Sequence, residues 1–282
     1  MASGRVGMTM TPVPPNGRVA LVTGAARGIG AATVQTLAMA GWAVLAIDSV
    51  AGDDPALPYR MGTHAELSIV VEDACRLAGA DGRVRSFVAD VRDLPAMTAA
   101  VVKAEEVWGG LDAAIAVAGV IAGGVPLWEM PLAEEKVVLD VDLGGVINLA
   151  RVAIPALLRR PVPRSGRFLA VASAAATQGL PMLAAYCAAK AGVTGLVRAL
   201  ASELGPLGIT ANAVSPGSTT TAIHDQSALL YSLPALTAFV AQHPIQRLLD
   251  PVEIATVLTF LAGEGSSAMT GAIVPVDGGL SL

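Results

Sequence analysis

Short apolar runs alternate with longer segments rich in Ala and Leu along most of the chain. Seven of these runs are mostly β-branched or aliphatic and predict strands at residues 18–23, 43–47, 84–89, 113–117, 167–172, 210–214 and 272–276. Hydrophobicity that is continuous along each run is typical of parallel strands covered on both faces. The pattern therefore predicts one α/β domain: a doubly wound, seven-stranded parallel sheet with helices on both faces.

Three segments fall outside this alternation. Residues 49–63 carry two prolines and an acidic pair, which predicts an inserted loop before a helix that begins near His64. Residues 218–250 contain no predicted strand, and their length is typical of a substrate lid or binding loop. Residues 1–17 lack the pattern of a signal peptide and are expected to form a flexible N-terminal arm. The single domain then spans residues 18–282.

The composition narrows the classes of protein to which the chain can belong. It is 54% hydrophobic and 15% charged, so a core, a membrane or an oligomer interface must hide much apolar surface. The uncharged stretches 28–47 and 168–189 are interrupted by glycine, glutamine or proline, which argues against membrane spans. A net charge of -5 without basic clusters argues against nucleic-acid and membrane partners. Two cysteines without metal-ligand spacing predict no disulfide framework, no metal site and a cytoplasmic location. We therefore expect a small-molecule partner.

A glycine-rich turn follows the first predicted strand. Gly24, Gly28 and Gly30 are spaced G-x-x-x-G-x-G, which differs from the common G-x-G-x-x-G, and residues 31–39 can form a helix behind them. Glycines let the backbone approach a pyrophosphate, whose charge is met by the N–H groups at the start of the helix. The pattern favours dinucleotide binding, although a tight turn alone would also account for it.

The second predicted strand ends at Asp48, and no Arg follows it directly. A carboxylate here can accept hydrogen bonds from ribose hydroxyls and would repel a 2'-phosphate, so NAD is favoured over NADP. Two alternatives remain: Asp48 could be a turn residue only, and Arg27 could pair with a phosphate.

Tyr186 and Lys190 lie four residues apart in an Ala-rich helical segment and would share one face of the helix. A nearby ammonium favours phenolate and lowers the pKa of a tyrosine, which would suit Tyr186 to acid/base chemistry. Ser173, at the end of the fifth predicted strand, supplies a hydroxyl that could hold a substrate oxygen. Taken alone, a Y-x-x-x-K sequence is also a common surface pair.

Together these motifs resemble the short-chain dehydrogenase/reductase (SDR) family over residues 18–282. The resemblance rests on the glycine turn, Asp90-Val91, Ala118-Gly119, Ser173, Tyr186-x-x-x-Lys190, residues 212–217 and residues 276–279. It implies a Rossmann fold, an NAD cofactor, and a homotetramer paired through the helices at 137–158 and 184–204. It also implies that Tyr186 exchanges a proton with the substrate oxygen, that Lys190 binds the nicotinamide ribose and lowers the Tyr186 pKa, and that Ser173 orients the substrate.

The resemblance also implies a set of cofactor-binding residues from six parts of the chain. They are Gly24, Arg27, Gly28, Ile29, Gly30, Asp48, Asp90, Val91, Ala118, Gly119, Tyr186, Lys190, Pro216, Gly217, Thr219 and Thr221.

The chain departs from the family pattern at two places. Residues 116–119 read Ala-Val-Ala-Gly where the family usually has Asn-Asn-Ala-Gly. Asp142 stands where the resemblance places a fourth catalytic residue, an Asn. Asp142 could still position a water for a proton relay through Lys190, but an ionised carboxylate cannot donate a hydrogen bond.

The insertion at 49–63 is similar to one found in the mycofactocin-associated subfamily, whose members are thought to hold NAD tightly and to recycle it through an external redox carrier. An ordinary surface elaboration is an equally good interpretation.

The segments expected around the substrate are mostly apolar, which predicts a hydrophobic secondary alcohol or ketone as substrate. They contain Ile121, Leu127, Trp128, Met130, Leu180, Met182, Leu183, Ile223, Leu229, Leu230, Tyr231 and Phe239. His224 and His243 also lie there and are interpreted as solvated or capping residues. Two alternatives to an NAD-dependent alcohol dehydrogenase or ketone reductase are a 3-oxoacyl thioester reductase, against which Asp48 argues, and a non-catalytic dinucleotide-binding regulator, which only Asp142 favours.

Overall fold

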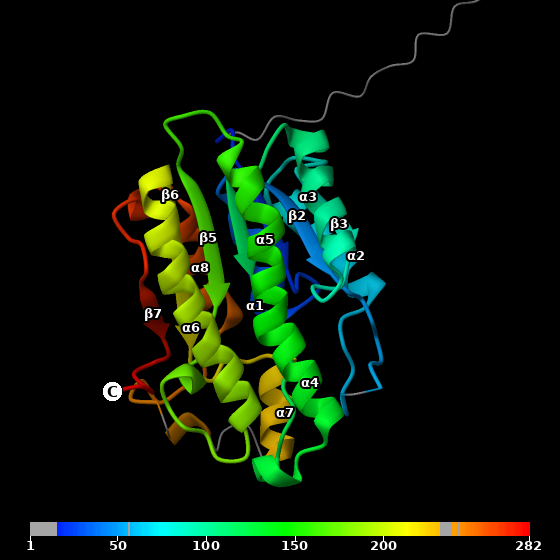
Figure 1. The fold of residues 1–282 in the computed structure, drawn as a ribbon. Helices are drawn as coiled ribbons and strands as arrows, with labels where there is room; N and C mark the ends of the chain where they lie inside the picture. The colour runs from blue at the N-terminus through cyan, green and yellow to red at the C-terminus, as the bar shows by residue number, and fades with distance from the viewer. Residues whose placement is uncertain (1–15, 56, 232–238, 242) are drawn as a thin grey trace, which may run out of the picture.

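Seven parallel strands form one sheet in the order β3-β2-β1-β4-β5-β6-β7 (Figure 1). The structure is a computed structural model that describes residues 16–55, 57–231, 239–241 and 243–282. The strands are β1 (Val19–Thr23), β2 (Ala43–Asp48), β3 (Val84–Val88), β4 (Ala113–Ala116), β5 (Gly166–Val171), β6 (Ile209–Pro216) and β7 (Ile273–Val276). The seven predicted strands and the doubly wound topology are confirmed, and β6 runs two residues further than expected.

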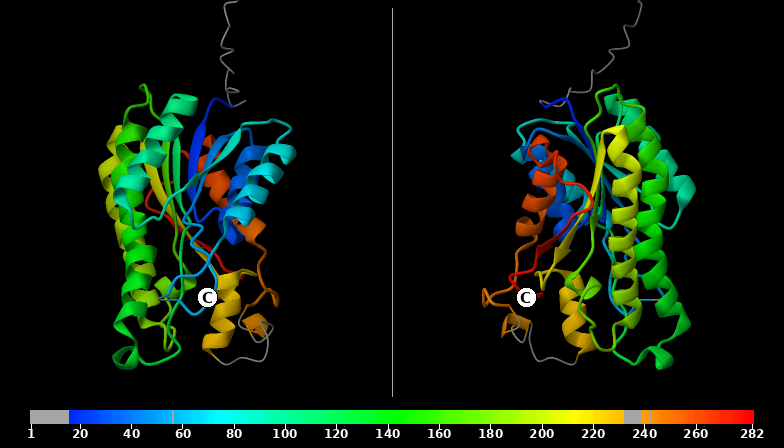
Figure 2. Two further views of the ribbon diagram at one scale, coloured as in Figure 1. Left: turned by 90° about the vertical axis from the view of Figure 1, so that its right-hand side faces the viewer. Right: turned by 60° about the vertical axis from the view of Figure 1, so that its left-hand side comes forward.

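Helices cover both faces of the sheet, as Figure 2 shows. On one face lie α1 (Gly28–Met39), α2 (His64–Leu77) and α8 (Pro251–Ala262). On the other lie α3 (Leu94–Trp108), α4 (Leu132–Leu139), α5 (Gly145–Leu158) and α6 (Ala184–Leu204). The helix expected at 137–158 begins earlier, at Leu132, and a π-helical turn over Asp140–Gly144 interrupts it. The layered arrangement is the Rossmann fold.

Local sequence explains where two of the helices begin. At the start of α2, the Thr63 hydroxyl accepts from the Glu66 N–H at 3.3 Å, and the Glu66 carboxylate accepts from the Thr63 N–H at 2.8 Å. This reciprocal capping box satisfies backbone donors that the helix itself leaves unpaired. Asp250 and Glu253 form the same arrangement at the start of α8. The predicted helix start near His64 is therefore confirmed.

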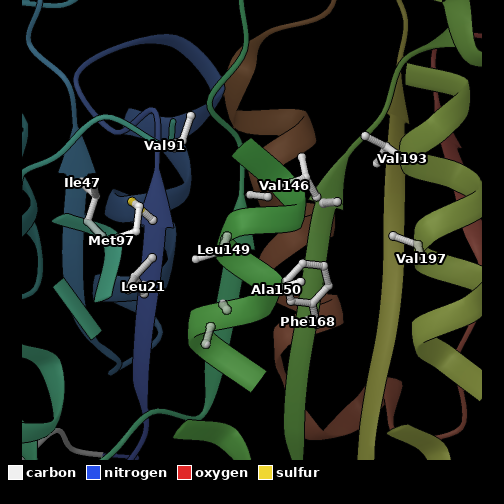
Figure 3. Close-up of a cluster of buried hydrophobic side chains, with 14 of the residues drawn as sticks. Leu21, Ile47, Val91, Met97, Val146, Leu149, Ala150, Phe168, Val193 and Val197 are labelled. Atoms are coloured by element: carbon white, nitrogen blue, oxygen red, sulfur yellow. The ribbon is translucent and has the colours of Figure 1, made fainter. Parts of the chain in front are cut away.

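The core consists of two apolar layers, one on each face of the sheet. Along β1, Leu21 packs into one layer and Val22 into the other, so both faces of the strand are buried. Figure 3 shows α5 directing Val146, Leu149 and Ala150 toward the strands that carry Leu21 and Phe168. This double coverage explains why the strands appear in the sequence as continuous apolar runs.

The carboxyl ends of the strands meet at one edge of the sheet, beyond which α7 (Ala222–Leu230) and several long loops lie (Figures 1 and 2). The order of the strands reverses between β1 and β4, and ligands of doubly wound sheets bind at such a switch point. Among the described helices, none is both long and apolar enough to cross a membrane. The predicted N-terminal arm lies outside the described residues except for Asn16 and Gly17.

Candidate functional site

A cavity of about 830 Å³ opens at the carboxyl edge of the sheet. The glycine turn and the ends of β2 and β4 bound one half, while Ser173, the start of α6 and α7 bound the other. Its wall contains every residue predicted to bind the cofactor: Gly24, Arg27, Gly28, Ile29, Gly30, Asp48, Asp90, Val91, Ala118, Gly119, Tyr186, Lys190, Pro216, Gly217, Thr219 and Thr221. The fold therefore brings residues from six separate parts of the chain to one site.

Steric constraints at the glycine turn explain two of its glycines. Gly24 has a φ of +68°, and a Cβ on Gly30 would lie 1.9 Å from the Gly24 carbonyl oxygen. Helix α1 begins at Gly28, three residues before the predicted start at 31, and its N-cap residue Arg27 makes no side-chain cap. The first-turn N–H groups of α1 therefore lie at the cavity wall without a side-chain partner, an arrangement that fits a pyrophosphate.

Asp48 and Asp90 line the same half of the cavity. The Asp48 carboxylate accepts from the Ala26 and Val50 N–H groups, both at 3.0 Å, and these bonds fix its orientation. Asp90 forms an ion pair with Arg92 at 2.7 Å, and Arg92 also reaches Asp54 at 3.3 Å. This half is polar and charged, as the adenosine end of a dinucleotide requires.

Ser173, Tyr186 and Lys190 meet at the boundary between the two halves. Lys190 lies one helical turn beyond Tyr186 on α6, and its ammonium nitrogen is 5.6 Å from the centre of the Tyr186 ring. The ammonium donates to the Val171 carbonyl at 3.2 Å, which holds the side chain against the end of β5. Ser173 follows that strand and hydrogen-bonds the Tyr186 phenol. These contacts place a proton donor, a hydroxyl and a buried cation around one point.

Asp142 lies behind this group, within the π-helical turn that joins α4 to α5. The side chain is fully buried; Oδ1 accepts from the Val120 N–H at 2.7 Å, and Oδ2 is 3.7 Å from the Lys190 ammonium. Burial raises the pKa of Asp142 to about 6, against the opposing effect of Lys190. Oδ2 has no hydrogen-bond partner among the described residues. Asp142 thus adds a negative charge at the position where the family pattern has an uncharged Asn.

The expected lowering of the Tyr186 pKa is wrong for this structure. Burial raises that pKa, the negative charge of Asp142 raises it further, and only the hydrogen bond with Ser173 lowers it. The Lys190 ammonium, which pairs with Asp142 and with the Val171 carbonyl, does not lower the Tyr186 pKa here. The spacing of Tyr186 and Lys190 gave no indication of this competing carboxylate.

Tyr59 is a cavity neighbour that its sequence pattern did not indicate. It belongs to the insertion at 49–63, and its phenolic oxygen accepts from the Ile121 N–H, beyond β4, at 2.9 Å. The Arg27 guanidinium donates to the Arg60 carbonyl at 2.8 Å, so the insertion is also bonded to the glycine turn. Leu57 and Met61 line the cavity between these attachments. We call residues 49–63 the strap.

The substrate half is apolar, but only part of the predicted set lines it. Ile121, Leu180, Leu183, Ile223, Tyr231 and Phe239 do so. The others do not: Trp128 is 85% exposed and Leu229 is 70% exposed. The two ends of the predicted lid at 218–250 lie side by side, because the Thr220 N–H donates to the Leu249 carbonyl at 2.9 Å. Its residues 232–238 and 242 lie outside the described residues.

Of the two interpretations of His224 and His243, solvated or capping, the first is wrong because both residues are buried. The His243 ring hydrogen-bonds the Phe239 carbonyl at 3.0 Å and accepts from the Ser218 N–H at 3.1 Å. His224 lines the cavity and packs on Phe239, with ring centroids 4.4 Å apart. Sequence spacing carried no signal for either contact.

Comparison with known proteins places the chain among dehydrogenases and reductases. Residues 61–281 match the family model described as Enoyl-(Acyl carrier protein) reductase. The chain is 36% identical to a cis-4-hydroxycyclohexanecarboxylate dehydrogenase of Sinomonas cyclohexanicum, over 93% of this chain and 96% of the relative. It is 34% identical to a (-)-trans-carveol dehydrogenase of Rhodococcus erythropolis, over 94% and 98%. The crystal structure of carveol dehydrogenase from Mycobacterium avium in complex with NAD superposes with a TM-score of 0.87 at 32% identity, covering 94% of this chain and 97% of that one.

Proposed function

Because the chain belongs to the short-chain dehydrogenase/reductase family of oxidoreductases, we propose that it transfers a hydride between NAD and a hydrophobic secondary alcohol or its ketone. The observation that carries this proposal is the meeting of Ser173, Tyr186 and Lys190 between a polar half and an apolar half of one cavity. The same meeting argues against a non-catalytic regulator.

Each side chain has a separate role in the proposed reaction. NAD, when bound, supplies the hydride acceptor or donor. The Ser173 hydroxyl holds the substrate oxygen, and Tyr186 takes the proton of an alcohol during oxidation or returns it to the ketone oxygen during reduction. When NAD is bound, Lys190 would hold the nicotinamide ribose from the wall of the cavity. The apolar wall excludes water from the reacting carbon.

Assay of the purified protein tests this function. It should oxidise cyclic secondary alcohols in the presence of NAD or an artificial electron acceptor, with little turnover of small charged hydroxy acids. Turnover confined to those acids would contradict the predicted substrate class. Preferential reduction of a 3-oxoacyl thioester with NADPH would instead favour the thioester reductase.

We also propose that the strap holds NAD tightly, so that an external redox carrier of the mycofactocin type regenerates it. The support is the strap's attachment on both sides of the cavity, at Arg27 and at Ile121. Mass spectrometry of the denatured protein should find NAD, and turnover should depend on an added electron acceptor. A protein that is purified without NAD and turns over freely added NAD would contradict this.

Tyr59→Phe tests the strap directly. The variant keeps the ring but loses the acceptor for the Ile121 N–H, and one lost hydrogen bond of about 1 kcal/mol corresponds to roughly a fivefold change in rate. We expect NAD to dissociate about fivefold faster, as measured by exchange with labelled NAD. Pro58→Ala, at an exposed neighbouring position, is the control. An unchanged exchange rate in Tyr59→Phe would show that the strap does not retain the cofactor.

Asp48→Asn tests the choice of dinucleotide. The amide keeps the shape and an acceptor oxygen for the Ala26 N–H but removes the charge that repels a 2'-phosphate. The ratio of NADP to NAD extracted from the purified protein should rise about fivefold. An unchanged ratio would reduce Asp48 to a turn residue, the alternative that the sequence left open.

We propose a homotetramer as the assembled state. The outward positions of α6 support it, because they are small and exposed, which allows a second helix to approach closely: Ala184, Ala188, Ala191, Gly195 and Ala199. Light scattering of the purified protein should give four times the chain mass of 28.4 kDa. A monomeric mass would contradict this proposal.

A further inference from the structure

The His224 side chain lines the cavity and carries a buried ring nitrogen without a hydrogen-bond partner in the described part of the chain. It is 7% exposed, and its Nε2 has no hydrogen-bond partner among the described residues. Burying such a nitrogen without a partner is unfavourable, so buried polar atoms of this kind usually meet a protein group, a water or a ligand. The imidazole lies in the cavity wall, where a ligand can supply that partner.

Three other polar side chains of the substrate half each have a partner within the protein. The Gln178 amide donates to the Leu280 carbonyl at 2.6 Å, and the Tyr231 hydroxyl donates to the Pro181 carbonyl at 2.7 Å. The Ser227 hydroxyl donates to the Ile223 carbonyl within α7 at 2.9 Å. Among the described side chains that line the cavity, His224 is the one with a fully buried polar atom that has no partner.

The backbone of α7 holds the imidazole in place. Thr221 caps the helix by accepting from the His224 N–H, and Thr221 itself lines the cofactor half. The ring packs against Phe239 at an interplanar angle of 53°. Residues of α7 one turn apart face the cavity, so the position of His224 is fixed relative to the cofactor half by a short, capped helix.

The charge around His224 restricts the kind of group it can meet. Burial lowers its pKa, with a further lowering from His243 that Asp225 opposes, so the ring is neutral near pH 7. Arg27, Arg92 and Lys190 are the cationic side chains in the described wall, and none belongs to the lid. Residues 218–246 contain no Arg or Lys at all. A neutral imidazole can donate or accept one hydrogen bond at each nitrogen. Beyond Lys190 at its boundary, the described wall of this half contains no cation that could neutralise a carboxylate.

We propose that His224 binds a second, neutral oxygen of the substrate, a hydroxyl or a ketone carried on the apolar ring whose first oxygen reacts at Tyr186 and Ser173. This inference rests on the proposed function and names its substrate class. A cyclic diol or hydroxyketone can hydrogen-bond with His224 through one oxygen and with Tyr186 and Ser173 through the other. The rest of its ring then lies in the apolar half of the cavity. A ring with only one oxygen leaves His224 without a partner, and a ring carboxylate brings an uncompensated charge.

Four compounds with the same ring distinguish these cases. The 1,3 and 1,4 isomers of cyclohexanediol carry a second neutral oxygen, 4-methylcyclohexanol carries none, and 4-hydroxycyclohexanecarboxylate carries a charge. The kcat/KM of the better diol should exceed that of the methyl compound by at least about fivefold, with the carboxylate the poorest. In His224→Phe the ratio of the two kcat/KM values should fall to about one. His224→Ala, which leaves a space and keeps a good helix former, should lose the same advantage.

The control is His64→Phe, an exposed histidine at the start of α2 whose side chain does not line the cavity, which should keep the wild-type preference. Because the preference is a ratio within one protein preparation, it does not depend on the fraction of active enzyme. Three results would each overturn the assignment. The wild type could show no preference for a diol, it could prefer the carboxylate, or the preference for a diol could persist in both His224 variants. Failure of the wild type to oxidise any of these alcohols would instead overturn the proposed function itself.

Discussion

Replacing Tyr186 by Phe should lower kcat/KM by about 10²- to 10⁴-fold for both alcohol oxidation and ketone reduction. The phenol is the group that Ser173 and Lys190 surround at the junction of the two cavity halves. Phe keeps the ring and its packing on α6 but removes the only proton that the ring can exchange. The measurement is steady-state kinetics in both directions with a cyclic alcohol and its ketone.

Two controls distinguish a chemical effect from a structural one. The variant should retain the same amount of bound NAD as the wild type. Tyr231→Phe, which removes a phenol that is already bonded to the Pro181 carbonyl, should lose less than about fivefold. A loss below tenfold in Tyr186→Phe would show that another group carries the proton.

Asp142→Asn should move the pH dependence of alcohol oxidation by about one unit toward lower pH. The pKa of Asp142 is raised to about 6, so its carboxyl is protonated below that pH and charged above it. The charged form raises the pKa of Tyr186, and the amide variant lacks that charge. The phenolate of the variant therefore forms at lower pH, and one unit corresponds to tenfold faster oxidation on the rising limb of the profile.

For the reverse reaction, Asp142→Asn should change the rate at high pH in the opposite direction. Ketone reduction needs the protonated phenol, so its decline at high pH should begin about one unit earlier in Asp142→Asn. Below about pH 6 the wild type loses the charge of Asp142, and the two proteins should converge. The amide oxygen can still accept from the Val120 N–H, which preserves the loop. Identical profiles for the two proteins would limit Asp142 to that structural bond.

Much of the fold could be predicted because its elements are encoded locally. The strands are buried on both faces, as Leu21 and Val22 are, and so appear as uninterrupted apolar runs. Thr63 and Glu66 identify the start of α2 because a capping box needs only residues three apart. The π-helical turn at Asp140–Gly144 could not be foreseen, since its apolar spacing is close to that of an ordinary helix.

The site was predictable only where one motif holds the interacting groups. Tyr186 and Lys190 share a helix, and the glycine turn is contiguous. The bond from Ile121 to Tyr59 joins residues that are 62 positions apart, and no local pattern records it. The pKa of Tyr186 depends on Asp142, which tertiary packing brings close. Burial of His224 and His243 likewise depends on how the lid folds over the cavity.

The two ends of residues 218–250 are hydrogen-bonded to each other beside the sheet. The Leu249 N–H donates to the Ser218 carbonyl at 3.0 Å, and Thr219 forms a parallel bridge with Leu249. A segment closed at its base in this way can be exchanged or lengthened at small entropic cost to the rest of the chain. The residues between these two paired ends can therefore be replaced without changing the strands that precede the glycine turn and Ser173. Such replacements offer a route by which substrate specificity can evolve.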